Sequence, residues 1–262
     1  MFAYLNGDSG GLPERGAPPE RRVVEVGYIL DTERAGFIWE APRPCRRNDN
    51  QVQHSKSVGV CPAVLDYEAR LFEVTCPVDV HLRFQMDDKG QPQLINVAGD
   101  KSSIRSKHLR QMVAVMPRKE WRHQNRPIIQ FITPYIFVAD DVCWMNQMPA
   151  FNHYRPTQLP GTMIGGRLPI HLWPRPMMWA FEWYEPQKDL IMKRGEPWFY
   201  CRFETDDPRR PIRMVEAEKN QVLTDYMTGL NSVTNYVSRT FSLFSVAEQR
   251  RPKKLLFRKA KD

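Results

Sequence analysis

Two polar side chains in the aromatic-rich centre of the chain, His171 and Glu182, are of types that bind metal ions. They flank residues 174–177, where two prolines favour a reversal of the chain. If Trp173 pairs with Met178 across this turn, both side chains lie on one face of a β-hairpin, because side chains alternate along a strand. An imidazole and a carboxylate on one sheet could begin a metal site, as in a metal-dependent β-barrel enzyme. No third ligand has matching spacing, so we expect no metal, no cofactor and a hydrogen-bonded histidine.

The same predicted hairpin has one apolar face and one mixed face. The apolar face is predicted to be core and carries six large side chains: Leu168, Ile170, Leu172, Trp179, Phe181 and Trp183. The mixed face is the predicted binding surface for a ligand or a partner: His171, Trp173, Met178, Glu182 and Tyr184. A shift by one residue would mix the two faces, which favours this register.

Other groupings of reactive residues point only weakly to catalysis. Asp140 and Asp141 follow an apolar strand, where adjacent carboxylates can bind Mg²⁺ with a phosphate, but such a pair more often caps a turn. The sequence has no GxSxG, no Walker-type glycine loop and no GxGxxG. We therefore favour a protein that is not an enzyme.

Positive charge is concentrated at the C-terminal end. The chain has a net charge of +8, and residues 250–262 hold seven lysines and arginines against one aspartate, a net of +6. The other residues together carry +2, so the basicity belongs largely to this tail. Such a tail is either solvated and weakly ordered or binds non-specific nucleic acid or an acidic partner. The residues expected to make those contacts are Arg250, Arg251, Lys253, Lys254, Arg258 and Lys259.

The elements that must position these residues are predicted to be mainly β-strands. The 22 prolines outnumber the 14 glycines, which favours short strands joined by turns over long helices. We expect a sandwich or distorted barrel over residues 23–204, preceded by a disordered N-terminal arm over residues 1–22. Five cysteines form no CxxC pair, and no secretory signal or membrane span is visible. These features predict reduced thiols in the cytoplasm.

One long C-terminal helix is predicted over residues 205–249. From Met214 to Glu248 there is no proline, and large apolar residues recur at spacings of three and four. The stripe comprises Leu223, Tyr226, Leu230, Val233, Val237, Phe241 and Phe244. It could pack on the sheet of its own chain. Alternatively, the helix over residues 214–248 binds a partner protein or a second copy of the chain.

The central run over residues 127–204 resembles a family of uncharacterised, largely bacteriophage-encoded proteins. The resemblance rests on GGRLPIHLWPRPMMWAFEW followed by KRGEPWFYCRF, with Trp179, Phe181, Trp183 and the Gly195–Pro197 turn at the shared positions. It implies an all-β domain of phage origin, located in the host cytoplasm or the virion, and it implies no activity.

A second resemblance is to the β-clip group of dUTPases and dCTP deaminases. Pro160-Gly161-Thr162-Met163-Ile164 and the later Gly195-Glu196-Pro197 are similar to that group's layout. The catalytic Asp of the pattern is missing, because Gly165 and Gly166 follow Ile164. The resemblance therefore implies a fold more than a reaction.

Three functions follow from these observations as hypotheses. The first is a non-enzymatic, phage-type binding or assembly protein that acts through its β-domain surface and its helix. The second is an enzyme, either a β-clip nucleotide hydrolase or the metal-dependent barrel enzyme described above. The third is a nucleic-acid accessory protein that acts through the basic tail.

Overall fold

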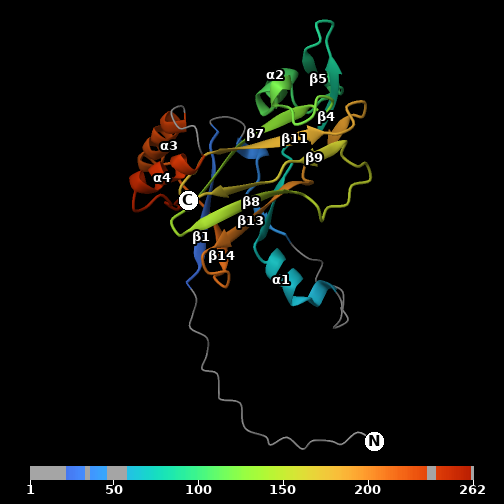
Figure 1. The fold of residues 1–262 in the computed structure, drawn as a ribbon. Coiled ribbons are helices and arrows are strands. Elements are labelled where there is room, and N and C mark those ends of the chain that lie inside the picture. The colour runs from blue at the N-terminus through green and yellow to red at the C-terminus, as the bar shows by residue number, and fades with distance from the viewer. Residues whose placement is uncertain (1–21, 33–35, 46–57, 235–239, 261–262) are drawn as a thin grey trace, which may run out of the picture.

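The computed structural model describes residues 22–32, 36–45, 58–234 and 240–260. The arm predicted over residues 1–22 lies outside the described residues except for Arg22. The described part of the chain is mainly β, which confirms the predicted class, and it contains three sheets and four short α-helices (Figure 1).

The first sheet is built around its longest strand, β7 (Ile128–Ala139), and contains six strands. Its other members are β1 (Val24–Leu30), β6 (Val113–Val115), β9 (Gly161–Met163), β11 (Pro176–Trp183) and β14 (Ile212–Glu216). All pairings are antiparallel except that of β1 with β14. Pro134 lies in β7 where the register with β11 shifts, a position at which no ladder hydrogen bond needs its missing N–H.

The second and third sheets are smaller. The second contains β2 (Arg43–Pro44), β3 (Leu71–Thr75), β8 (Cys143–Pro149), β10 (Gly166–Pro169) and β13 (Pro197–Thr205). The third contains β4 (Val80–Met86), β5 (Pro92–Asn96) and β12 (Leu190–Met192).

An aromatic core joins the first two sheets. Trp179, Phe181 and Trp183 of β11 are fully buried, as their alternation predicts. Trp179 stacks with Trp198, and Phe137 of β7 contacts Phe203 of β13. Burial of each such side chain contributes about 2 kcal/mol to folding.

The predicted hairpin around residues 174–177 is wrong. Residues 166–169 pair with β8 in the second sheet, whereas β11 pairs with β7 and β9 in the first. The proline-rich connection therefore carries the chain from one sheet to the other instead of joining neighbouring strands.

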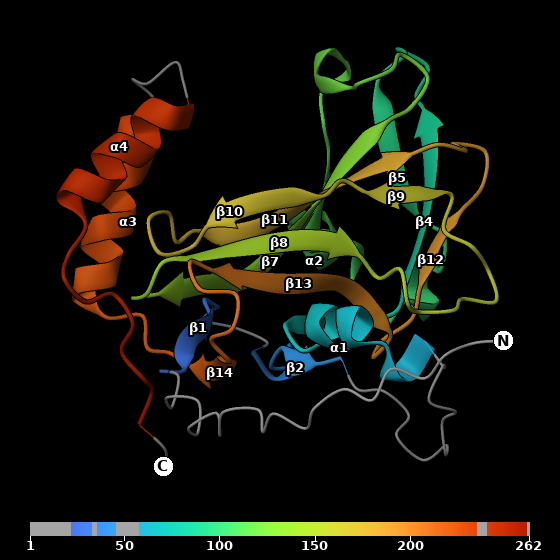
Figure 2. The ribbon, with the colours of Figure 1, turned by 60° about the horizontal axis from the view of Figure 1, so that its bottom comes forward.

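The single long C-terminal helix is also wrong. Residues 212–216 form β14, and two helices follow, α3 (Gln221–Thr234) and α4 (Thr240–Arg250). They lie side by side at one end of the sheets (Figures 1 and 2), and the Tyr226 hydroxyl of α3 donates to the Ala247 carbonyl of α4 at 2.9 Å.

The helix pair packs on the outer face of the first sheet. Leu223, Tyr226 and Leu230 are buried, as the predicted stripe requires, and they lie in one cluster with Ile136 and Val138 of β7. Val237 of that stripe lies outside the described residues, as do the side chains of Val233 and Phe241. The alternative in which the stripe covers its own sheet therefore accounts for the described positions.

Two further helices lie nearer the middle of the chain. Helix α1 (Pro62–Glu68) has no buried residue, whereas α2 (Ser106–Met112) buries Leu109 and Met112. Four short 3-10 helices complete the described elements: Gly36–Ile38, Val58–Val60, Gly99–Lys101 and Arg118–Glu120.

Candidate functional site

The predicted pair His171 and Glu182 lies at opposite ends of β7. Arg251 donates to the carbonyls of both His171 and Ala139, the last residue of β7, whereas Glu182 pairs with Ile128, its first residue. The strand is twelve residues long, so its two ends lie roughly 35 Å apart at ~3.3 Å per residue. One metal ion cannot contact both side chains, and no group of three or more potential metal ligands occurs among the described residues.

His171 serves the packing of the fold. Its side chain is buried, and Nδ1 lies 2.9 Å from the carbonyl oxygen of Cys143. Burial lowers the pKa of His171, its hydrogen bond to Cys143 opposes that shift, and the charge of Arg251 adds to it. The ring is therefore held in its neutral form between Trp144 and the Cys143 backbone.

The other members of the predicted binding surface are divided as well. Trp173 contacts Phe244 of α4 and is part of the helix packing. Met178 is half-buried opposite Ile132 of β7. Tyr184 is 47 % exposed, beyond the end of β11. The predicted face is thus not one surface, because the hairpin that would unite it does not form.

The acidic pair after β7 anchors the C-terminal segment. Oδ1 of Asp140 accepts hydrogen bonds from the backbone amides of Leu255 and Leu256, at 2.6 and 3.2 Å. Asp141 forms an ion pair with Arg210 at 2.9 Å. Both carboxylates therefore have structural partners, which are distant in the sequence and do not belong to the local turn.

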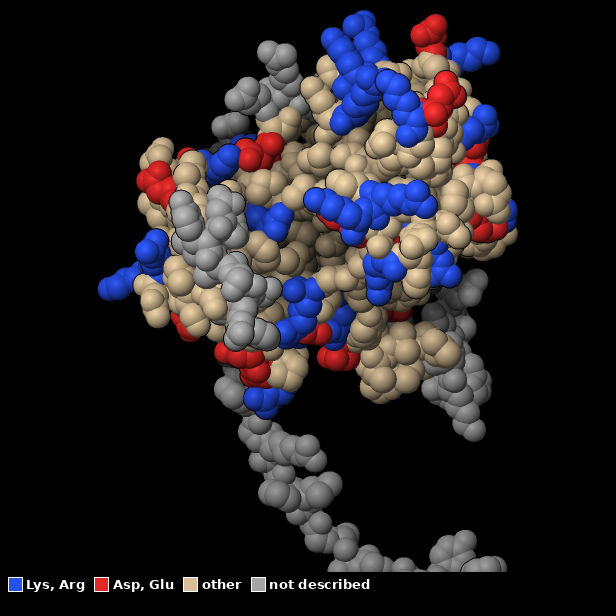
Figure 3. Space-filling view, turned by 45° about the horizontal axis from the view of Figure 1, so that its top comes forward, with Lys and Arg blue, Asp and Glu red and all other residues tan. Residues whose placement is uncertain are grey.

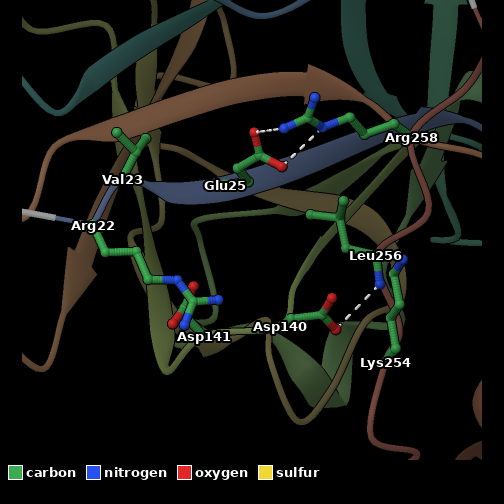
Figure 4. A pocket seen from close by; sticks show the side chains of 8 residues that line it. All are labelled: Arg22, Val23, Glu25, Asp140, Asp141, Lys254, Leu256 and Arg258. Atoms are coloured by element: carbon green, nitrogen blue, oxygen red, sulfur yellow. Dashed lines mark hydrogen bonds and ion pairs between the residues drawn. The ribbon is translucent and has the colours of Figure 1, made fainter.

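A depression of about 560 Å³ lies beside this anchor (Figure 4). Its lining includes Glu25 and Arg258, whose side chains form an ion pair, and Asp140, bonded to the Leu256 amide. The carboxylates of this depression are thus paired, whereas Arg22 and Lys254, which also line it, form no ion pair among the described residues.

The basic C-terminal segment packs on the fold. Leu255 and Leu256 are buried, and backbone hydrogen bonds join Lys259 to Glu216, the last residue of β14, and Phe257 to Glu218. Three of the six predicted contact residues have internal partners: Arg251 donates to backbone carbonyls, Arg258 pairs with Glu25, and Lys259 pairs with Glu216. The remaining three are exposed: Arg250, Lys253 and Lys254.

The cysteines agree with the prediction of reduced thiols. All five are free, and Cys76, Cys143 and Cys201 are buried. Burial raises the pKa of the Cys76 and Cys143 thiols to about 12, so neither is a nucleophile at neutral pH.

A basic surface that the tail-centred prediction missed lies over residues 101–126. This segment holds eight lysines and arginines against Glu120 alone, and eight minus one leaves a net charge of +7. We call these eight cations the basic surface: Lys101, Arg105, Lys107, Arg110, Arg118, Lys119, Arg122 and Arg126. All eight are exposed. Figure 3 shows Lys and Arg side chains gathered on the upper part of the molecule, which carries α2 in Figure 1.

Helix α2 and the β6–β7 connection present six of the eight cations of the basic surface. Lys107 and Arg110 lie on α2, whose buried Leu109 and Met112 fix the opposite side of the helix to the core. Arg118 and Lys119 lie in the 3-10 helix within the β6–β7 connection, residues 116–127. Within the described residues, Arg122 alone of the eight cations has an ion pair, with Glu182 at 3.7 Å.

The β6–β7 connection is tied to the end of β11. The Trp183 amide donates to the Pro127 carbonyl at 2.9 Å, and the Arg126 guanidinium lies 5.1 Å from the centroid of the Tyr184 ring. Two residues of the predicted binding surface, Glu182 and Tyr184, therefore lie beside the basic surface. Summing the charge over short segments of the sequence identifies the basic surface. Summing over all residues outside the tail does not, because the residues outside 101–126 and 250–262 carry a net charge of −5.

The chain matches no known protein family, no curated protein and no solved structure. The resemblances to a phage-encoded family and to the β-clip group therefore stay predictions. No helix among the described residues is long and apolar enough to cross a membrane.

Proposed function

We propose that this chain is a non-enzymatic binding protein whose partner is nucleic acid, held by the basic surface. The observation that carries the proposal is the concentration of eight exposed cations in residues 101–126, only one of which has an ion pair among the described residues. Solvated, uncompensated cations on ordered elements are the feature that phosphate backbones bind. The phage-type assembly role stays a prediction from resemblance.

The scaffold suits this role. We take the first and second sheets as a sandwich; α2 packs on its core, and the β6–β7 connection joins two strands of the first sheet. Each phosphate neutralised by a lysine or arginine releases a counterion, so binding should weaken steeply with salt. If six to eight of the cations contact phosphates, affinity should fall by about 10³-fold or more between about 50 and 200 mM salt.

A pair of charge-matched variants tests the location of binding. The first reverses three cations of the basic surface that have no described partner: Lys107→Glu, Arg118→Glu and Lys119→Glu. The second reverses three exposed cations of the C-terminal segment: Arg250→Glu, Lys253→Glu and Lys254→Glu. Both variants change the net charge by the same amount, so only the position of the change differs between them.

We expect the first variant to bind a fluorescent single-stranded oligonucleotide about 10²- to 10³-fold more weakly than wild type at about 0.1 M salt, because three phosphate contacts are lost. The second variant should stay within a few fold of wild type. Equal losses of affinity in both variants would show that only the net charge matters. A larger loss in the second variant would place the binding site on the C-terminal segment.

A further inference from the structure

Glu182 is a buried carboxylate beneath the basic surface. The residue is 3 % exposed, and its Oε1 has no hydrogen-bond partner among the described residues. The side-chain nitrogens that approach it belong to Arg122, 3.7 Å from Oε2, and His123, 4.0 Å from Oε1. Both distances are too long for hydrogen bonds. A buried acceptor without a donor is costly, so this carboxylate retains a free capacity to accept N–H groups.

Two side chains of the β6–β7 connection that lie within 4.0 Å of Glu182 extend into solvent. The side chains of Arg122 and His123 are 63 and 60 % exposed. To reach the carboxylate, a ligand held by the basic surface would displace the His123 ring, while Arg122 stays beside it as a cation.

An exposed aromatic ring lies next to this carboxylate. Tyr184 follows Glu182 by two residues, in the bend after β11, and both side chains meet the β6–β7 connection: Glu182 lies beside Arg122, and the Tyr184 ring lies beside Arg126. The ring is 47 % exposed and is accompanied by the Arg126 guanidinium. Aromatic rings flanked by arginines are the platforms on which unpaired bases stack.

We infer that Glu182 and Tyr184 read one unpaired guanine of the bound nucleic acid, an inference that rests on the function proposed above. The Watson–Crick edge of guanine carries two adjacent donors, N1–H and the 2-amino group, which match the two oxygens of a carboxylate. Adenine and cytosine offer one amino group next to a ring acceptor, and thymine offers one N–H between two carbonyls. Guanine is therefore the base that satisfies Glu182 most fully.

The same geometry selects single strands. In a duplex the Watson–Crick edge is already paired, so Glu182 cannot contact it. Arg122, which pairs with Glu182, and Arg126, which lies over the Tyr184 ring, would contact the phosphates next to the selected base.

The test compares oligothymidylates that differ at one central position. Wild-type protein is titrated into fluorescent oligonucleotides with central thymine, adenine, cytosine, guanine or hypoxanthine, which lacks the 2-amino group. We expect about tenfold tighter binding or more for guanine, because a good bidentate pair discriminates by that factor. Hypoxanthine should be intermediate.

Variants assign the two roles separately. Glu182→Gln should abolish the preference for guanine, measured as the ratio of the affinities for the guanine and the thymine oligonucleotides. Tyr184→Ala should weaken all five oligonucleotides about tenfold, since stacking is tolerant of sequence, whereas the matched Tyr184→Phe should bind as wild type does. Thermal unfolding of each variant checks that the fold is retained.

The outcomes separate the two proposals. If wild type binds every oligonucleotide with the same salt-dependent affinity, base reading is overturned and the proposed function stands. The same holds if Glu182→Gln keeps the guanine preference. If wild type binds none of the oligonucleotides, the proposed function fails and base reading fails with it.

Discussion

The buried imidazole of His171 links the stability of the fold to pH. Burial holds its pKa below the ordinary value of about 6.5, so the unfolded chain takes up this proton at a higher pH than the folded chain does. The stability that comes from neutral His171 should therefore be fully present above about pH 6.5 and decline below it. Urea unfolding at about pH 7.5 and about pH 5.5 measures the loss.

His171→Gln should reduce that pH dependence, because glutamine does not titrate. His108→Gln is a suitable control, since His108 is exposed on α2 and its ring contacts only Gln111 among the described residues. A wild-type protein that gains stability on acidification, or a His108 variant that loses the pH dependence equally, would contradict the role of His171.

At the level of single residues, sequence patterns predict which side chains are buried better than they predict which residues those side chains contact. The alternation of Trp179, Phe181 and Trp183 predicts their burial correctly because alternation is a local property of a strand. The chemical surroundings of Glu182 depend on the β6–β7 connection, more than fifty residues away along the chain. No local pattern in the sequence specifies that contact.

The packing of α3 on the first sheet predicts an asymmetric response to mutation. Leu223 is fully buried against the sheet, whereas its neighbour Val222 is 44 % exposed. Leu223→Ala should lower the free energy of unfolding by about 2–5 kcal/mol, because it leaves a cavity in a packed cluster. Val222→Ala should change it by about 0.5 kcal/mol or less. Chemical denaturation of the two variants measures both values.

Size-exclusion chromatography with light scattering adds the decisive control for α3. If Leu223→Ala leaves stability unchanged but dissociates an oligomer, the helix serves a partner subunit and the packing on its own sheet is wrong. If it lowers stability at constant mass, the structure described above holds.

Among the elements, most strands were predictable and their pairings were not. Residues 166–169 and β11 have the alternation of strands, and both are strands. They were expected to pair because only a short proline-rich turn separates them. Their actual partners, β8 and β7, are chosen by the packing of the aromatic core between two sheets. The prediction of one long helix is wrong for a related reason. Residues 212–216 form a strand because they pair in parallel with β1, and their own sequence does not predict that pairing.

For the whole molecule, the distribution of charge matters more than its total. The net charge of +8 combines +7 in residues 101–126, +6 in residues 250–262 and −5 elsewhere. The C-terminal charges are partly used within the fold, by Glu25, Glu216 and backbone carbonyls. The basic surface has only the Arg122–Glu182 contact among the described ion pairs and so keeps its charge available to a partner. The sequence shows where the cations are concentrated, but only the structure shows which of them form ion pairs within the fold.

The most direct test of the central claim is to locate the bound nucleic acid on the protein. Amide hydrogen exchange, measured with and without a saturating single-stranded oligonucleotide, reports which backbone segments are protected by binding. We predict protection of α2, of the β6–β7 connection and of the end of β11, with little change in residues 250–260. Protection confined to residues 250–260, or no protection at residues 101–126 when the oligonucleotide is bound, would contradict the basic surface as the binding site.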